Sequence, residues 1–193
     1  MRNHCLLLVL AAWAVAPDAR ATPILGNMPP DNDATQTAAI NDQRQKAYRF
    51  TIGPDSLVAG DLILRLRNYD APGEAIAELR DANTDTAPGS TVLLTFVAPP
   101  PGGGGIDNYT FVPQDTFVLQ ASTTYWIVVL GVADGAFDWM ASNPGIAPAG
   151  LATYGSSSFT SNGGSDWGSS TLLTTFAFFV DGSIFSDGFE SPL

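Results

Sequence analysis

Short runs of alternating hydrophobic and polar residues, separated by Gly, Pro, Asn, Asp and Ser, dominate the chain. In the segment 46–53, Tyr48, Phe50 and Ile52 fall on one side, and Arg49 and Thr51 fall on the other. Successive side chains of a β-strand point to opposite faces of a sheet, so such a run predicts a strand with one buried face. Similar runs occupy 60–69, 91–97, 107–113, 115–120 and 171–182. Sustained helical periodicity is absent, and the pattern predicts an all-β protein with a jelly-roll-like antiparallel β-sandwich.

In the segment 91–97, the alternation places three apolar side chains on one face: Val92, Leu94 and Phe96. The segment 123–130 breaks the rule, because both of its faces are apolar. One face carries Tyr125, Ile127 and Val129, and the other carries Trp126, Val128 and Leu130. A strand of this kind is typical of the interior of a sheet, with a cover on its outer side. The cover is either a loop, a short helix or a ligand.

The first 21 residues resemble a targeting signal rather than part of the sandwich. A basic start at Arg2 precedes an apolar run from Cys5 to Ala16, and the small residues Ala19 and Ala21 follow. This arrangement predicts a secretory signal peptide at 1–21. The strand-like runs then place a β-sandwich domain at 22–182, and the residues after the last run, 183–193, form a C-terminal tail that includes IFSDGFESPL. The apolar run of the leader is too short for a comfortable membrane span, and the tail has no apolar run long enough for an anchor helix, so no stable membrane span is expected in the mature chain. The expected location is secreted, extracellular or at the cell surface.

Charge and the missing residue types exclude several functions. The chain carries a formal net charge of −11, which repels the phosphates of nucleic acids and anionic lipids. Cleavage would remove Cys5 and His4, the only cysteine and histidine, and with them any disulfide, Cys/His zinc site or imidazole base. Glu74 and Glu78 are four residues apart, but nothing apolar encloses them in sequence. We therefore expect a protein that is not an enzyme and has no cofactor.

Calcium is the one metal for which the sequence offers candidate ligands. Asp81, Asn83 and Asp85 have the alternate spacing of a calcium loop, in which oxygens converge on a hard cation. The match stops there, because the sixth position is Thr86 and the twelfth is Val92. The alternative is an Asp- and Asn-rich turn between two strands.

Three aromatic residues are candidates for ligand binding: Trp167, Tyr154 and Trp126. Trp167 lies in a Gly/Ser-rich loop beside Asp166 and close to Asn162, a setting suited to stacking on a sugar. The alternative is packing, because burying a Trp removes about 150–250 Å² of surface from water. For Trp126 and Trp139, a position in the core is the stronger interpretation.

The order of the strand motifs is similar to that of a known family. The stretches YRFTIG, LVAGDLILRL, AIAELRDANTDTAPGSTVLLTF and NYTFVPQDTFVLQASTTYWIVVLG, followed by FDWMAS, resemble the choice-of-anchor R domain of exported bacterial proteins. The similarity covers about residues 40–180 and is strongest at Thr124-Tyr125-Trp126 and at the hairpin with Pro88-Gly89. The resemblance implies a β-sandwich displayed outside the cell, and it carries no catalytic residues with it.

Together, these patterns predict a secreted or cell-surface, non-enzymatic β-sandwich domain with a structural or adhesive role. Its expected partners are extracellular polysaccharides or surface components. The alternative is a carbohydrate-binding module that uses exposed aromatic residues.

Overall fold

The computed structural model describes residues 22–29, 36–71, 74–132 and 136–181. These residues form thirteen β-strands and contain no helix. The strands are β1 (Pro23–Gly26), β2 (Thr37–Ile40), β3 (Gln45–Thr51), β4 (Leu57–Arg67), β5 (Ala75–Ala82), β6 (Pro88–Val97), β7 (Asp107–Pro113), β8 (Val118–Leu119), β9 (Thr124–Gly131), β10 (Phe137–Met140), β11 (Thr153–Thr160), β12 (Gly168–Ser169) and β13 (Phe176–Val180). The predicted leader and tail lie outside the described residues.

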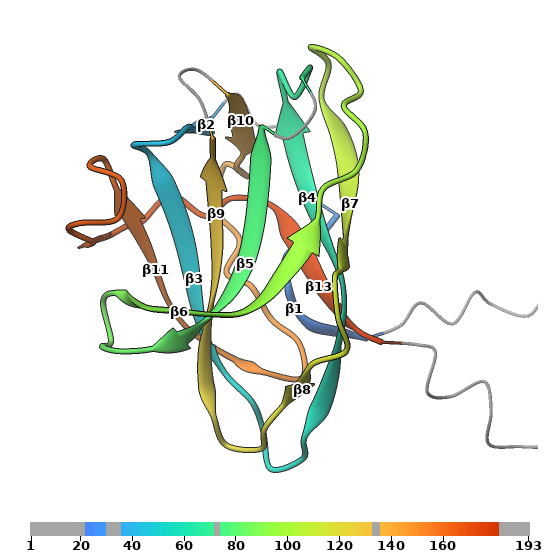
Figure 1. The fold of residues 1–193 in the computed structure, drawn as a ribbon, viewed down its shortest axis with the longest axis vertical. Helices are drawn as coiled ribbons and strands as arrows, with labels where there is room; N and C mark the ends of the chain where they lie inside the picture. Colours follow the sequence, from blue (N-terminus) through green and yellow to red (C-terminus); the bar gives the residue numbers. More distant parts are fainter. Residues whose placement is uncertain (1–21, 30–35, 72–73, 133–135, 182–193) are drawn as a thin grey trace, which may run out of the picture.

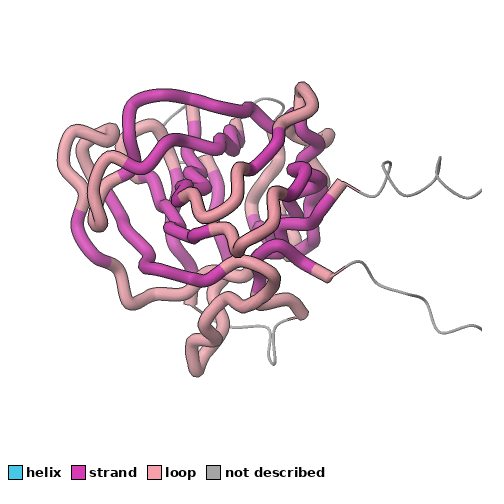
Figure 2. Tube along the Cα trace, turned by 90° about the horizontal axis from the view of Figure 1, so that it is seen from below, coloured by secondary structure: helices cyan, strands magenta, loops and turns pink. Residues whose placement is uncertain are grey.

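Two antiparallel sheets form the sandwich (Figure 1). In the first sheet the order is β1-β13-β4-β7, and β10 pairs with one end of β4 and with β2. In the second sheet the order is β6-β5-β9-β3-β11-β12. A short pairing of β6 with β7 joins the sheets along one edge, and β8 pairs with the start of β4. Figure 2 shows only strands and loops in the described chain, which confirms the predicted all-β antiparallel fold.

The core between the sheets consists of the apolar side chains that alternate with polar ones along the strands, as predicted. Leu62, Leu64 and Leu66 of β4 are fully buried, as are Tyr48 and Phe50 of β3. Each fully buried large apolar side chain contributes about 1.5–3 kcal/mol relative to an exposed one. The core therefore follows from one repeated feature, an apolar residue at every second position of facing strands.

Strand β9 lies between β5 and β3 in the second sheet, as an interior strand. Its residues from Tyr125 to Val129 are buried without interruption, so both of its faces are covered. The doubly apolar pattern thus predicted the position of this strand correctly.

One expected face is interrupted in β6. Leu94 and Phe96 are buried, but Val92 is 44% exposed. The register between β5 and β6 shifts at this point, where Leu79 pairs with Leu94 but the next residue, Arg80, pairs with Val92. An extra residue in one strand leaves the alternation broken and bends the strand. The prediction that Val92 shares the buried face is wrong for this reason.

Buried polar groups fix the segment that leads into β13. Tyr48 Oη lies 3.0 Å from Thr174 Oγ1 and accepts a hydrogen bond from the Thr174 backbone N–H. Trp139 Nε1 donates to the Thr175 carbonyl at 3.0 Å. Because a buried polar group without a partner is costly, these bonds hold the segment before β13 against β3 and β10.

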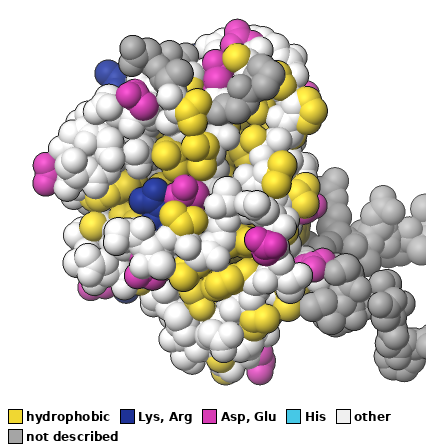
Figure 3. Space-filling model, viewed as in Figure 1, with side chains coloured by type: hydrophobic (Ala, Val, Ile, Leu, Met, Phe, Trp, Pro, Cys, Tyr) yellow, Lys and Arg dark blue, Asp and Glu magenta, His cyan; other side chains and the backbone are white. Residues whose placement is uncertain are grey.

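Among the described residues, none belongs to a helix that could cross a membrane. On the face seen in Figure 1, acidic side chains are dispersed over the surface and outnumber basic ones (Figure 3). This distribution agrees with the strongly acidic composition of the chain.

Candidate functional site

The outer face of the second sheet, on the side away from the main core, carries a small second cluster. Ala47 of β3 and Trp126 and Val128 of β9 form it, and Leu130 and Trp167 pack against it. Trp126 and Val128 have no exposed surface. The cover of the doubly apolar strand therefore includes Trp167, which belongs to the loop between β11 and β12.

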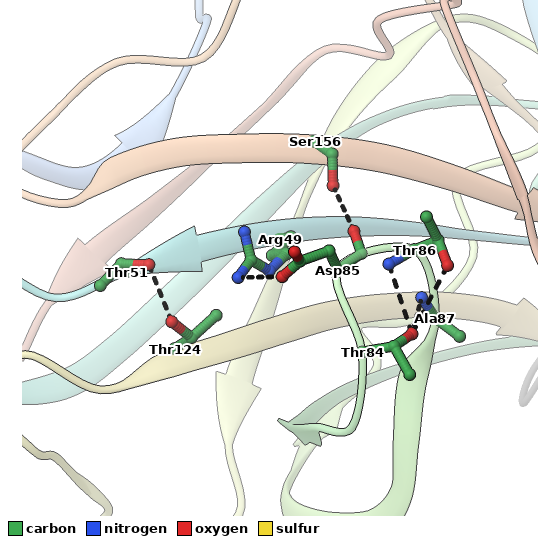
Figure 4. Close-up of polar contacts among 8 residues, drawn as sticks. All are labelled: Arg49, Thr51, Thr84, Asp85, Thr86, Ala87, Thr124 and Ser156. Carbon is green, nitrogen blue, oxygen red and sulfur yellow. Dashed lines mark hydrogen bonds and ion pairs between the residues drawn. The ribbon is translucent and has the colours of Figure 1, made fainter.

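The hairpin between β5 and β6 reaches across the same face (Figures 1 and 4). The carboxylate of Asp85 lies 2.7 Å from the Arg49 guanidinium. Ser156 Oγ donates to the Asp85 carbonyl at 3.2 Å, and Ser158 Oγ donates to the Thr86 carbonyl at 2.8 Å. The tip of the hairpin is thus attached to β3 and β11, two strands that lie beyond β9 in the sheet.

The hairpin tip is also organised internally. Thr84 Oγ1 accepts hydrogen bonds from the backbone N–H groups of Thr86 and Ala87, at 3.3 and 3.0 Å (Figure 4). Ser and Thr hydroxyls commonly stabilise turns in this way. The turn is therefore held by its own side chains as well as by its contacts with the sheet.

The three predicted calcium ligands lie in this hairpin, and two of them have other partners. Asp81 Oδ1 accepts a hydrogen bond from the Thr91 backbone N–H at 3.1 Å, and Asp85 pairs with Arg49. Asn83 is exposed at the tip. Within the described ranges, no group of three or more acidic, histidine or cysteine side chains is placed to hold a metal ion. The three residues belong to the end of β5 and the turn that follows it, and calcium binding there stays a prediction.

The three aromatic candidates divide between two sides of the second sheet. Trp126 is buried in the outer cluster, and Trp167 is half-buried against it. Tyr154 of β11 packs instead against the main core, with its ring centroid 6.3 Å from that of Tyr48. Burial raises the pKa of Tyr154 above its usual value. Trp126 and Trp167 are therefore brought together, and Tyr154 is separated from them by the sheet.

Two buried N–H donors lie on neighbouring strands beneath the hairpin. Arg49 and Trp126 are direct register partners, and Arg49 Nε and Trp126 Nε1 are buried without a hydrogen-bond partner among the described residues. Both groups are donors only. Beneath the surface of the outer face, these two atoms are therefore donors that lack an acceptor among the described residues.

The two glutamates that lie four residues apart in the sequence, Glu74 and Glu78, also have partners. Glu78 lies 2.6 Å from Arg80, and Glu74 Oε2 accepts from the Ala71 backbone N–H at 3.2 Å. These contacts stabilise β5 and the loop that precedes it.

The sequence interpretation missed Lys46 of β3. This side chain is 1% exposed, and its Nζ donates to Ser170 Oγ at 2.8 Å. The alternation contained the signal, because Lys46 has the same parity as Tyr48 and Phe50, which point into the core. Burial lowers the pKa of Lys46 to about 8.

No family model, no curated protein and no solved structure matches this chain. The resemblance to the choice-of-anchor R domain therefore rests on the strand motifs in the sequence, and it stays a prediction.

Proposed function

We propose that the chain is an exported, non-enzymatic β-sandwich domain with a structural or adhesive role at the cell surface or outside the cell. The observation that carries the proposal is the closure of β9 on both faces by the chain itself. Trp126 is buried under side chains from other segments, and the β5–β6 hairpin is bonded to β3 and β11. A sheet closed in this way is suited to mechanical and thermal persistence.

The leader pattern in residues 1–21 supports export, and the acidic surface supports solubility outside the cell. Expression of the precursor in a bacterial host, followed by intact mass measurement of each cell fraction, tests the proposal. The expected product begins at Thr22 and appears outside the cytoplasm. A matched precursor with Leu7→Arg, which interrupts the apolar run, is expected to stay inside.

A cytoplasmic product that retains His4 and Cys5 would contradict the export part of the proposal. The structural part is tested separately, by resistance of the purified chain to protease at a temperature where it stays folded. Rapid cleavage within the hairpin segment 83–87 would contradict a closed outer face, because attached segments are cleaved slowly.

Carbohydrate binding is a second candidate, supported by the half-exposed ring of Trp167. In the same loop, Asn162 donates to the carboxylate of Asp166, the residue before Trp167, at 2.8 Å. Titration of tryptophan fluorescence with a panel of neutral polysaccharides tests this function. The expected response is lost in Trp167→Ala and kept in Trp139→Phe, because Trp139 is fully buried. A response that persists in Trp167→Ala would exclude this ring as the binding surface.

A further inference from the structure

Lys46 is the only lysine in the chain, and it is buried in a hollow formed by β2, the end of β11 and the segment after β12. Its Nζ lies 5.4 Å from the ring centroid of Tyr48 and donates one hydrogen bond, to Ser170 Oγ. An ammonium group has three N–H donors. Two donors of Nζ are therefore left without a protein acceptor among the described residues.

The positive charge in this hollow has no matching negative charge in the described structure. Lys46 takes part in none of the ion pairs of the described residues, and neither Asp nor Glu is among the residues that line the hollow. Buried charges in proteins are normally paired, because an isolated ion in a low-dielectric site loses its hydration without compensation. An anion that entered the hollow would remove much of that cost.

The walls of the hollow favour a particular kind of anion. The cavity has a volume of about 540 Å³, which lies in the range of small-molecule sites. Its hydroxyl-bearing residues are Thr37, Ser161, Ser169, Ser170 and Thr171. Phe159 and Leu172 add apolar surface, and the exposed Arg44 supplies a second positive charge. Hydroxyls that both donate and accept are suited to a ligand that carries hydroxyls of its own.

We propose that this hollow is a binding site for a small hydroxylated carboxylate, such as a sugar acid, whose carboxylate accepts hydrogen bonds from Lys46 Nζ. The charge of Lys46 and Arg44 selects the carboxylate, and the hydroxyl-bearing wall selects the polyhydroxylated part of the ligand. The site is separate from the outer cluster around Trp126.

The single lysine allows a direct test by NMR. The purified chain is labelled with ¹³C-lysine and ¹⁵N, so that one lysine side-chain signal reports on Lys46. Sodium glucuronate is the probe, with glucose as the neutral control and sodium acetate as the carboxylate without hydroxyls. Glucuronate is expected to shift the lysine signal and the amides of Ser169 and Ser170 saturably, with a dissociation constant on the order of 1 mM. Acetate is expected to bind about tenfold more weakly, and glucose is expected to give no lysine shift.

Two variants separate binding in the hollow from a general effect of charge. Lys46→Met removes the charge and keeps most of the unbranched apolar stem of the side chain. It is expected to weaken glucuronate binding at least tenfold, as followed by the Ser169 and Ser170 amides. Arg65→Gln removes one positive charge from β4, outside the hollow, and is expected to leave binding unchanged. A lysine signal that glucuronate does not move, an equal response to glucose, or undiminished binding by Lys46→Met would each overturn the proposal.

Discussion

Raising the pH from 7 to 9.5 is expected to stabilise the folded chain. Burial lowers the pKa of Lys46 to about 8 in the folded state, whereas the unfolded side chain keeps a value of about 10.5. Between these two values the unfolded state binds more protons than the folded state, so the free energy of unfolding rises with pH. Below the folded value both states are protonated, and the folded chain carries the full cost of the buried charge.

The size of the effect follows from the two pKa values. Each tenfold difference in proton affinity between the two states corresponds to about 1.4 kcal/mol, so the complete effect is about 3 kcal/mol. Folded Lys46 is largely deprotonated by pH 9.5, and about 2 kcal/mol of this gain is reached between pH 7 and 9.5. Arg44 and Tyr48 are the other charged or titratable groups beside Lys46 in the described structure. Burial raises the pKa of Tyr48, so this phenol stays neutral in the interval.

Urea denaturation at constant ionic strength, followed by tryptophan fluorescence at several pH values, measures this gain. Above about pH 10 the trend reverses, because burial raises the pKa values of Tyr48, Tyr69 and Tyr154, and unfolded tyrosines then lose their protons first. The control is Lys46→Met, which is expected to show a flat profile between pH 7 and 9.5. A wild-type free energy that stays level or falls in this interval, or an equal rise in the variant, would refute the reasoning.

Three substitutions in the β5–β6 hairpin and the second cluster test how these two features contribute to stability, each measured by chemical denaturation. Trp126→Ala is expected to lower the free energy of unfolding by about 3–5 kcal/mol, because the ring is fully buried. A loss below about 1 kcal/mol would show that the cluster is dispensable for stability. Gly89→Ala is expected to cost about 1–3 kcal/mol, because the new Cβ would lie 1.9 Å from Asp81 Oδ1, whereas Gly105→Ala meets nothing within 4 Å and should be neutral. Equal effects of the two glycine substitutions would contradict this packing. Asp85→Asn is expected to cost less than about 1 kcal/mol, since the Asp85 side chain is 86% exposed, and a larger loss would show that the ion pair anchors the hairpin more strongly than its geometry implies.

Local alternation predicted the strands of the core because each strand shows its buried face in its own sequence. Leu62, Leu64 and Leu66 illustrate this, since all three are fully buried in β4. The rule failed at Val92. The β5–β6 register shifts there, so residues two positions apart in the sequence no longer lie on the same face of the sheet. A shift of this kind depends on the partner strand, so a single strand pattern cannot reveal it.

The candidate site was predictable only in part, because its contacts join segments far apart in the chain. The sequence indicated that the outer side of β9 needs a cover, but it could not identify Trp167 as part of it. The loop of Trp167 has no apolar neighbours in sequence, and its packing partners come from β3 and β9. The inward direction of Lys46 could be read from the alternation, but its side-chain partner could not, because the partner found among the described residues, Ser170, lies 124 residues away.

The Gly/Ser-rich segment around β12 connects the outer cluster with the Lys46 hollow. Trp167 packs on the cluster around Trp126, and three residues later Ser170 accepts the hydrogen bond from Lys46. Two hydrogen bonds to Ser157 hold this segment against β11. The Ser157 carbonyl accepts from the Ser170 N–H, and Ser157 Oγ donates to the Ser170 carbonyl, both at 2.8 Å. Small residues suit this segment, because it must follow the edge of β11 closely while only its Trp enters a packed cluster. A stretch with little core-forming content therefore determines both the closure of the outer face and the position of the only partner of the buried lysine among the described residues.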